Sequence, residues 1–234
     1  MKKSFLTFIV VLFSSTVSLA NNSDFKTTIK LAKQGHTIAQ FNLGVMYDEG
    51  TGIPQDDIAA VKWYRKAAEQ GYTKAQYNLG YMYAEGNGVA QDDVKAVKWF
   101  SKAAEKGHTK AQYNLGWMYD NIILRSVAQD DVKAVQWFSK AAEKGHTKAQ
   151  YNLAQMYYRG RHVPQDDLRA YAWASVVAAQ KNSIKEKYIK EKSKKIVNQI
   201  RKKLTSNQLT ESQKLASDYW EKYVAPFNKR LSND

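Results

Sequence analysis

A stretch of about 36 residues occurs four times in this chain, and it constrains the fold more than any other feature. The copies begin at Thr37, Thr73, Thr109 and Thr147, so the first two intervals are 36 residues and the third is 38. A period of this length is typical of arrays of helix pairs, in which each unit completes its core only by stacking on its neighbours. The sequence therefore predicts an all-α fold, an α/α solenoid of antiparallel helix pairs, with function on a repeated surface.

The second copy indicates how one unit folds. Residues 73–84 carry apolar side chains at three- and four-residue intervals, which predicts an amphipathic helix that ends at the glycine-containing break 85–88. A second helix is expected to begin at Asp92, whose side chain can cap it, and to end at Gly107. Gly80 and the repeated alanines would let the two helices approach closely. The predicted buried stripe of the second helix is Val94, Val97, Phe100 and Ala104.

Three motifs recur in phase: Ala-x-Tyr-x-Leu-Gly-x-x-Tyr, Gly-x-Gly-Val and Lys-Ala-x-x-Trp-Phe-x-Lys-Ala-Ala-Glu-x-Gly. They resemble the Sel-one-like repeat family, a relative of the tetratricopeptide repeats, over residues 37 to about 180. The resemblance implies a tetratricopeptide-like superhelix whose first helices line the concave, binding side. Residues 30–36 look like the end of a truncated leading repeat.

The predicted organisation therefore has an array between two different ends. A lysine-rich helix is expected to carry an apolar stripe made of Ile189, Ile196, Val197, Ile200 and Leu204. Thr205 to Gln208 fits a capping box for a second helix that would cover the last repeat. The expected segments are a signal peptide (1–20), an N-terminal half repeat (21–36), repeats at 37–72, 73–108, 109–146 and 147–180, a basic C-terminal helical cap (181–225) and a flexible tail (226–234).

The first twenty residues have the pattern of a secretory signal peptide. Two lysines precede the apolar run 5–13, and Ser18-Leu19-Ala20 provides small residues for cleavage. The chain has no cysteine, so it has no thiol for lipid attachment and no thiolate metal site. We expect a periplasmic or secreted protein that is not a lipoprotein.

Two copies depart from the pattern at the turn between their helices. In the third, residues 120–127 replace the glycine-rich break and include Ile122, Ile123 and Leu124. This turn either folds back onto the neighbouring repeat or forms a protruding partner contact. In the fourth copy Gly160 remains, but Arg161 and His162 follow it, and only a local change is expected.

Candidate catalytic and metal-binding residues have simpler explanations. The Asp pairs at 56–57, 92–93, 130–131 and 166–167 each stand where a helix begins, which favours capping. His36, His108 and His146 share one repeat position in a turn, without the spacing of a metal site. Some cysteine-rich relatives are linked to penicillin binding or β-lactamase activity, but the Ser23-Asp24-Phe25-Lys26 stretch lacks the partner motifs of such enzymes. No catalytic residue, metal ligand or cofactor is predicted.

The candidate binding residues lie on the first helix of each repeat. One position there reads Val45, Tyr81, Trp117 and Gln155 in the successive copies, whereas its neighbours are nearly constant. A packing position should vary less than a surface position that meets a ligand, so Tyr81 and Trp117 are the leading candidates for recognition.

A row of asparagines, at 42, 78, 114 and 152, is instead identical in every copy. It either captures a peptide backbone or carboxylate, as an amide can, or forms a hydrogen bond that stacking requires in each repeat. Nearby lysines would suit an acidic peptide or a free C-terminal carboxylate. The full candidate set is Lys74, Tyr77, Asn78, Tyr81, Lys110, Tyr113, Asn114, Trp117, Lys148 and Asn152.

Most of the net charge of +14 lies in the tail, because residues 181–234 contain fourteen basic and six acidic side chains. The basic helix 185–203 is either a solvated face or a contact for an anionic membrane surface or envelope polymer. Nucleic acid is not expected, given the predicted export. We interpret the chain as a non-enzymatic adaptor that binds a protein or extended peptide on its concave face. The alternative is a cell-wall-directed protein, either a β-lactam hydrolase or an envelope-polymer binder.

Overall fold

The computed structural model describes residues 25–120, 129–161, 163–180 and 186–226, and within these ranges every regular element is a helix. The predicted all-α class and the pairing of consecutive helices are confirmed. The chain divides into two compact units, one ending at Lys106 and the other beginning at Gly107. In the described part of the chain, no helix is both long enough and apolar enough to cross a membrane.

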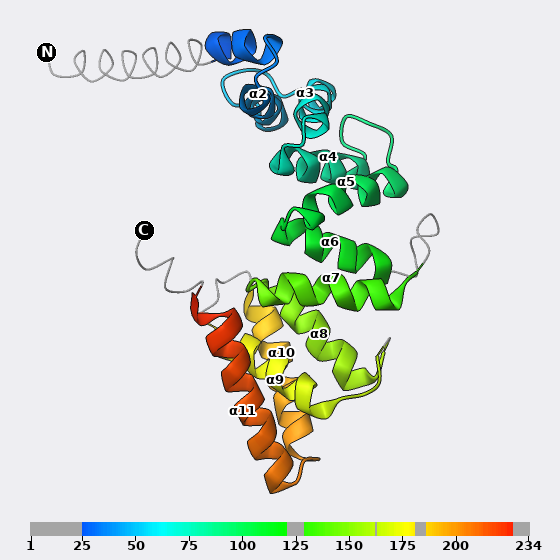
Figure 1. Ribbon diagram of the computed structural model, residues 1–234, viewed down its shortest axis with the longest axis vertical. Helices are drawn as coiled ribbons and strands as arrows, with labels where there is room; N and C mark the ends of the chain where they lie inside the picture. The colour runs from blue at the N-terminus through cyan, green and yellow to red at the C-terminus, as the bar shows by residue number, and fades with distance from the viewer. Residues whose placement is uncertain (1–24, 121–128, 162, 181–185, 227–234) are drawn as a thin grey trace, which may run out of the picture. The chain divides into compact units, whose positions relative to one another are not determined.

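The first unit contains two complete helix pairs behind a short leading helix, 25–33 (Figure 1). Its α3 packs against both α2 and α4, so the first repeat stacks on the second through its second helix. Ala32 in the leading helix is buried with Leu43 and Trp63, which closes the end of the stack. The labelled helices are α2 (Thr37–Glu49), α3 (Asp57–Glu69), α4 (Thr73–Glu85) and α5 (Asp93–Glu105).

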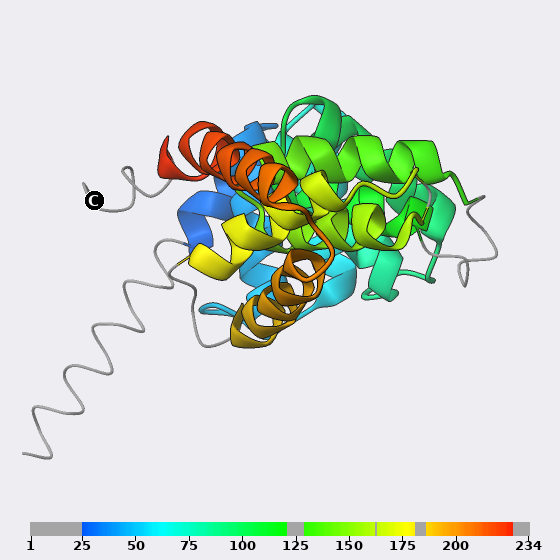
Figure 2. The ribbon, with the colours of Figure 1, turned by 90° about the horizontal axis from the view of Figure 1, so that it is seen from below.

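The second unit contains two further pairs and two terminal helices. The α9 helix lies between α10 and α11, which contact its opposite sides (Figure 2). Trp173 on α9 packs on Tyr219 and Tyr223 of α11, with ring centroids 4.4 and 5.7 Å away. The helices are α6 (Thr109–Asp120), α7 (Asp131–Glu143), α8 (Thr147–Arg159), α9 (Asp167–Ala179), α10 (Lys187–Arg201) and α11 (Ser206–Tyr223).

The helix ends follow from the capping residues. Asp56, Asp92, Asp130 and Asp166 each accept a hydrogen bond at 2.9 Å from the backbone N–H three residues on, which confirms that the Asp pairs open helices. The capping box predicted at Thr205 is also present. Gly86 ends α4 with φ of 76°, a left-handed conformation that favours glycine.

One part of the predicted buried stripe is wrong. Val94 is 58% exposed and Val97 is half-buried, whereas Ala96 is buried together with Phe100, Ala103 and Ala104. Each residue advances an α-helix by about 100°, so Val94 lies on the opposite side of α5 from Ala96. The apolar spacing was compatible with either phase, and the packing of α4 selects the one centred on Phe100.

In each of the first three helix pairs, a glycine faces an aromatic ring and lets the two helices approach closely. A Cβ atom on Gly80 would lie 2.8 Å from Cδ1 of Phe100, and one on Gly116 would lie 2.6 Å from Cδ1 of Phe138. In the fourth pair, both positions of this contact are alanine instead: Ala154 and Ala174, each fully buried. The fourth repeat thus changes both sides of the contact together.

Glutamines that sequence analysis did not single out link successive helices. Gln40, Gln76 and Gln150 are buried, and the Nε2 of each donates to a carbonyl eight residues earlier, on the preceding helix, at 3.0 to 3.2 Å. Buried amides of this kind need partners, because an unpaired one loses its hydration without compensation. These side chains fix the positions of α2, α4 and α8 against the helices that precede them.

Candidate functional site

The candidate site is the exposed side of the first helices, here called the first-helix face. It comprises the predicted positions on α4 in the first unit and, described separately, those on α6 and α8 in the second unit. Tyr81 on α4 is 44% exposed and Trp117 on α6 is 46% exposed, although both are large and partly apolar. Lys74, Lys110 and Lys148 are exposed in the first turns of these helices. Each helix therefore presents a positive charge near its start, and α4 and α6 also present an aromatic ring in the following turns.

Tyr77 and Tyr113, two other predicted residues, belong partly to the packing. Their ring centroids lie 5.7 Å from Phe100 and 5.8 Å from Phe138, the aromatic rings of the following helices. Tyr113 is also stacked on His146 at 4.5 Å. Only part of each ring is therefore available to a ligand, and packing between helices is the main role of these two residues.

Two members of the asparagine row bond to neighbouring repeats. Asn78 hydrogen-bonds the Tyr64 hydroxyl, which also donates to Oδ2 of Asp48 at 2.9 Å, and Asn152 hydrogen-bonds Tyr113. Burial raises the pKa of Tyr64 and of Asp48, so the tyrosine stays protonated as a donor. These contacts agree with the stacking interpretation for Asn78 and Asn152. Asn114 is half-buried.

The histidine position after the helix-stopping glycine is a helix N-cap. Nδ1 of His146 accepts from the Ala149 N–H at 3.3 Å, and Nδ1 of His108 accepts from the Ala111 N–H at the same distance. Burial, followed by the charges of Lys148 and Lys110, lowers the pKa of His146 to about 4. Across the described residues, no group of three or more His, Asp or Glu side chains is arranged to hold a metal ion.

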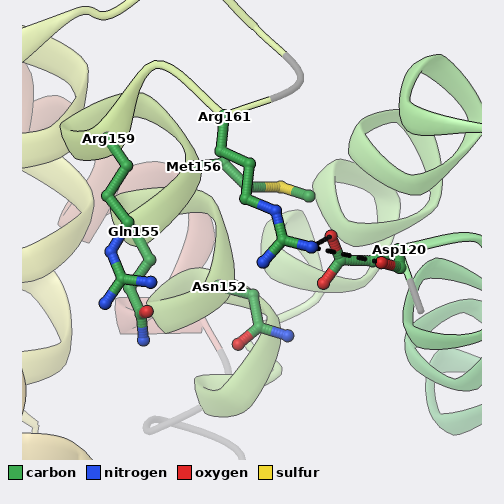
Figure 3. A pocket seen from close by; sticks show the side chains of 6 residues that line it. All are labelled: Asp120, Asn152, Gln155, Met156, Arg159 and Arg161. Atoms are coloured by element: carbon green, nitrogen blue, oxygen red, sulfur yellow. Dashed lines mark hydrogen bonds and ion pairs between the residues drawn. The ribbon is translucent and has the colours of Figure 1, made fainter. Parts of the chain in front are cut away.

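A small pocket opens at the end of α8 in the second unit (Figure 3). Its volume is about 50 Å³, enough for a few water molecules or one carboxylate group. Arg161 extends across it to Asp120, with Nη2 3.7 Å from Oδ1 and 3.5 Å from the backbone oxygen. The pocket is lined by Asp120, Asn152, Gln155, Met156, Arg159 and Arg161.

Of these six residues, only Asn152 was a predicted site residue. A signal for the others was present in the sequence, because α2 and α4 end on Glu49 and Glu85, whereas α8 ends on Arg159. This change from acid to base makes the fourth turn the most basic of the described turns between paired helices. Arg159 forms no ion pair with another described residue, so its charge faces the pocket and the solvent.

Some sequence-based predictions concern residues outside the described ranges. They are the apolar turn at Ile122 to Leu124, His162, Ser23 of the Ser-x-x-Lys stretch, and the signal peptide.

Comparison with known proteins adds the family. The Sel1 repeat matches at residues 37–72, 73–108, 109–146 and 147–182, which together exceed half of the chain. This chain belongs to the Sel1 repeat family. Members of the family generally act as scaffolds for protein interactions, and the fold is typically non-catalytic.

One solved structure supports the same assignment. A crystal structure of a Sel1 repeat protein from Oxalobacter formigenes is 33% identical, with 69% of this chain and 68% of that chain covered and a TM-score of 0.60. A putative Sel1 repeat protein from Klebsiella pneumoniae is 20% identical, with 82% and 99% covered and a TM-score of 0.48. The comparison with curated proteins gives no match.

Proposed function

We propose that this Sel1 repeat protein is an exported, non-enzymatic scaffold that binds a protein or extended peptide on its first-helix face, the concave side in the related repeats. The observation that carries the proposal is the exposure of Tyr81 and Trp117 at the one position that varies between otherwise similar repeats. Tyrosine and tryptophan are enriched among the residues that dominate binding energy at interfaces. Their exposure on a folded protein is therefore consistent with partner contact.

The charge of the face supports a partner with acidic groups. Burial is the main cause of the lowered pKa of His146, and the charges of Lys148 and Lys110 lower it further, so positive potential is present at the starts of α6 and α8. At the other end of α8, Arg159 adds a guanidinium beside the pocket amides of Asn152 and Gln155. An acidic side chain or a C-terminal carboxylate of the partner would pair with these groups.

Export is proposed from the first twenty residues, whose charge and apolar pattern match a signal peptide. Cell fractionation followed by N-terminal mass analysis tests it directly. We expect the protein in the envelope or medium fraction with Asn21 as its first residue. Recovery of an unprocessed chain in the cytoplasm would contradict this part of the proposal.

Partner binding is tested with the mature protein as bait in an envelope extract of the source cells, with captured proteins quantified by mass spectrometry. Trp117→Ala should reduce capture of the specific partner by about tenfold or more, as loss of an interface tryptophan does. Val132→Ala is the matched control, since Val132 is 64% exposed on α7, the second helix of the same repeat. It should leave capture unchanged.

The melting temperature separates a binding role from a structural one. Trp117→Ala should melt within about 2 °C of the wild type, because a half-exposed side chain contributes little to the core. Equal capture by the two proteins, or a large loss of stability, would remove Trp117 from the binding face. The alternative function predicts something else, namely nitrocefin hydrolysis by the mature protein that Ser23→Ala abolishes.

A further inference from the structure

A second surface of the same unit has the form of a binding groove. It runs between α9 and α10 of the second unit, and its lining residues belong to these two helices. Its volume is about 400 Å³. Ser175, Ala178 and Ala179 of α9 supply small side chains on one wall, and the buried Val197 of α10 also lines the groove.

The opposite wall of the groove is cationic. Lys194, Asn198 and Arg201 follow each other along α10, so the two charges lie seven residues, or about 10.5 Å, apart on one side of the helix. Lys194 pairs with Glu191 at 2.8 Å, and Arg201 reaches the Tyr171 hydroxyl at 3.4 Å. The Lys194 side chain is 47% exposed, and exposed pairs of this kind contribute little to stability because water screens them. Both cations thus remain available to a stronger partner.

The other repeats have a carboxylate at the position that Ala179 holds in this groove. The second helices of the first three repeats end on Glu69, Glu105 and Glu143, whereas α9 ends on Ala179, which is exposed and lines the groove. None of the residues that line the groove is acidic. The α10 helix itself carries six basic residues and one acidic residue. The groove therefore lacks the negative charge that the equivalent helix ends of the other repeats retain.

We propose that the α9–α10 groove is a second docking site, whose occupant is an acidic amphipathic helix of a partner protein. Two carboxylates seven residues apart on that helix would pair with Lys194 and Arg201. A small apolar side chain between them would pack on Ala178 and Val197, as in other helix-in-groove interactions. This inference does not depend on the first-helix face.

The geometry favours a peptide over a membrane surface. The apolar side of α10 is already occupied, since Ile196, Val197 and Ile200 are buried. An amphipathic helix binds a bilayer by inserting its apolar side, which α10 does not have free. A flat anionic surface would also contact the exposed lysines of α10 outside the groove, such as Lys187 and Lys195, before it reached the small residues of α9. Membrane contact through residues 185–203 would therefore rest on charge alone.

The test uses fluorescently labelled helical peptides of about 18 residues, acetylated and amidated so that their ends carry no charge. One peptide has two glutamates seven residues apart, and the control has the same composition with the glutamates five apart, on different sides of the helix. Binding to the mature chain is measured by fluorescence polarisation. The first peptide should bind about tenfold more tightly than the second, because only it presents both carboxylates to the groove.

Two variants assign the binding to the groove. The double variant Lys194→Gln with Arg201→Gln should lower the affinity for the first peptide by about tenfold. The double variant Lys187→Gln with Lys195→Gln removes the same charge outside the groove and should change this affinity less than twofold. Ala179→Glu restores the carboxylate of the other repeats and should block the peptide by about tenfold with an unchanged melting temperature. Trp117→Ala should bind it like the wild type.

Three outcomes would overturn the proposal. One is equal affinity of the wild type for the two peptides. Another is an equal loss of affinity in the two double variants, which would mean that the peptide is attracted nonspecifically to a basic helix. The third is sedimentation with phosphatidylglycerol vesicles that depends on Lys194 and Arg201 more than on Lys187 and Lys195, which would assign the groove to a lipid headgroup.

Discussion

The side-chain amide of Gln76 leaves one hydrogen-bond acceptor of the second repeat without a donor in the described part of the chain. Its Oε1 is buried and has no hydrogen-bond partner among the described residues. In the first and fourth repeats the equivalent oxygens accept from Gln70 at 2.6 Å and from Gln180 at 2.7 Å. The second repeat has Lys106 at this position, and its ammonium donates to the Gly71 carbonyl at 2.7 Å instead. Lys106 therefore supplies a donor to the Gly71 carbonyl but not to Oε1 of Gln76.

Lys106→Gln should therefore stabilise the protein. Gln70 donates both to Gln40 and, at 3.2 Å, to the Gly35 carbonyl, so a glutamine at 106 can satisfy Gln76 and Gly71 together. We expect a gain of about 1 kcal/mol, the usual net value of one buried hydrogen bond. Urea denaturation measures it. Lys106→Ala should be less stable than the wild type, and a glutamine variant no better than the alanine variant would contradict the explanation.

His146 gives the fold a dependence on pH. Its folded pKa of about 4 lies below the unfolded value near 6.5, so the unfolded chain takes up the proton first as the pH falls. Stability should decline between about pH 6.5 and 4, by up to about 3 kcal/mol at 1.4 kcal/mol per pKa unit.

Asparagine caps a helix without titrating in this range. Thermal melts at several pH values should thus show a flatter profile for His146→Asn than for the wild type. His36→Asn is the control, because His36 holds the equivalent position in the first unit but is exposed. An unchanged slope in the His146 variant would assign the acid sensitivity to other groups.

At the scale of the helix pair, the glycine and the facing ring are expected to act as one unit. Gly80→Ala would place a methyl 2.8 Å from Phe100 and push the helices apart, at a cost of about 1–3 kcal/mol that exceeds the gain in helix propensity. Phe100→Ala alone would leave a cavity. The double variant reproduces Ala154 and Ala174 of the fourth repeat, so it should lose at least about 1 kcal/mol less than the sum of the single losses. Additive losses in a denaturation cycle would argue against coupling.

The helices were largely predictable because their signals are local. An aspartate cap or a left-handed glycine acts within one turn, so their sequence positions match the observed helix ends closely. The buried side of α5 was less certain, since Val94 and Ala96 are both apolar and only the partner helix decides which is covered. The buried glutamines Gln40, Gln76 and Gln150 were not predicted, because a polar residue in a helix is normally expected to be exposed. Only the backbone carbonyl eight residues earlier, which accepts from the side chain, explains their burial.

At the scale of the whole molecule, the array was predicted from its period, whereas the surfaces that could bind were predicted only in part. Tyr81 and Trp117 were predicted because they occupy a position that varies between otherwise similar repeats, and both are exposed. The pocket at Arg161 and the α9–α10 groove depend on which helices lie next to each other, so no single segment carries their pattern. Even so, the departures at Arg159 and Ala179 were visible as changes of charge between aligned repeats. Such changes are a useful guide where repeats are otherwise similar.

The terminal helix α11 should be required for a stable second unit. It supplies Tyr219 and Tyr223 to the exposed end of the stack, where they cover Trp173, and leaves that residue only 5% exposed. A chain that stops after Leu204 would expose the tryptophan and lose the packing of two aromatic rings. Loss of one large buried aromatic side chain costs about 3–5 kcal/mol, so we expect a loss of at least about 3 kcal/mol and a red-shifted tryptophan emission. A chain that stops after Pro226 retains the whole helix and is the matched control. Equal melting temperatures for the two truncated chains would show that α9 is stable without this cover.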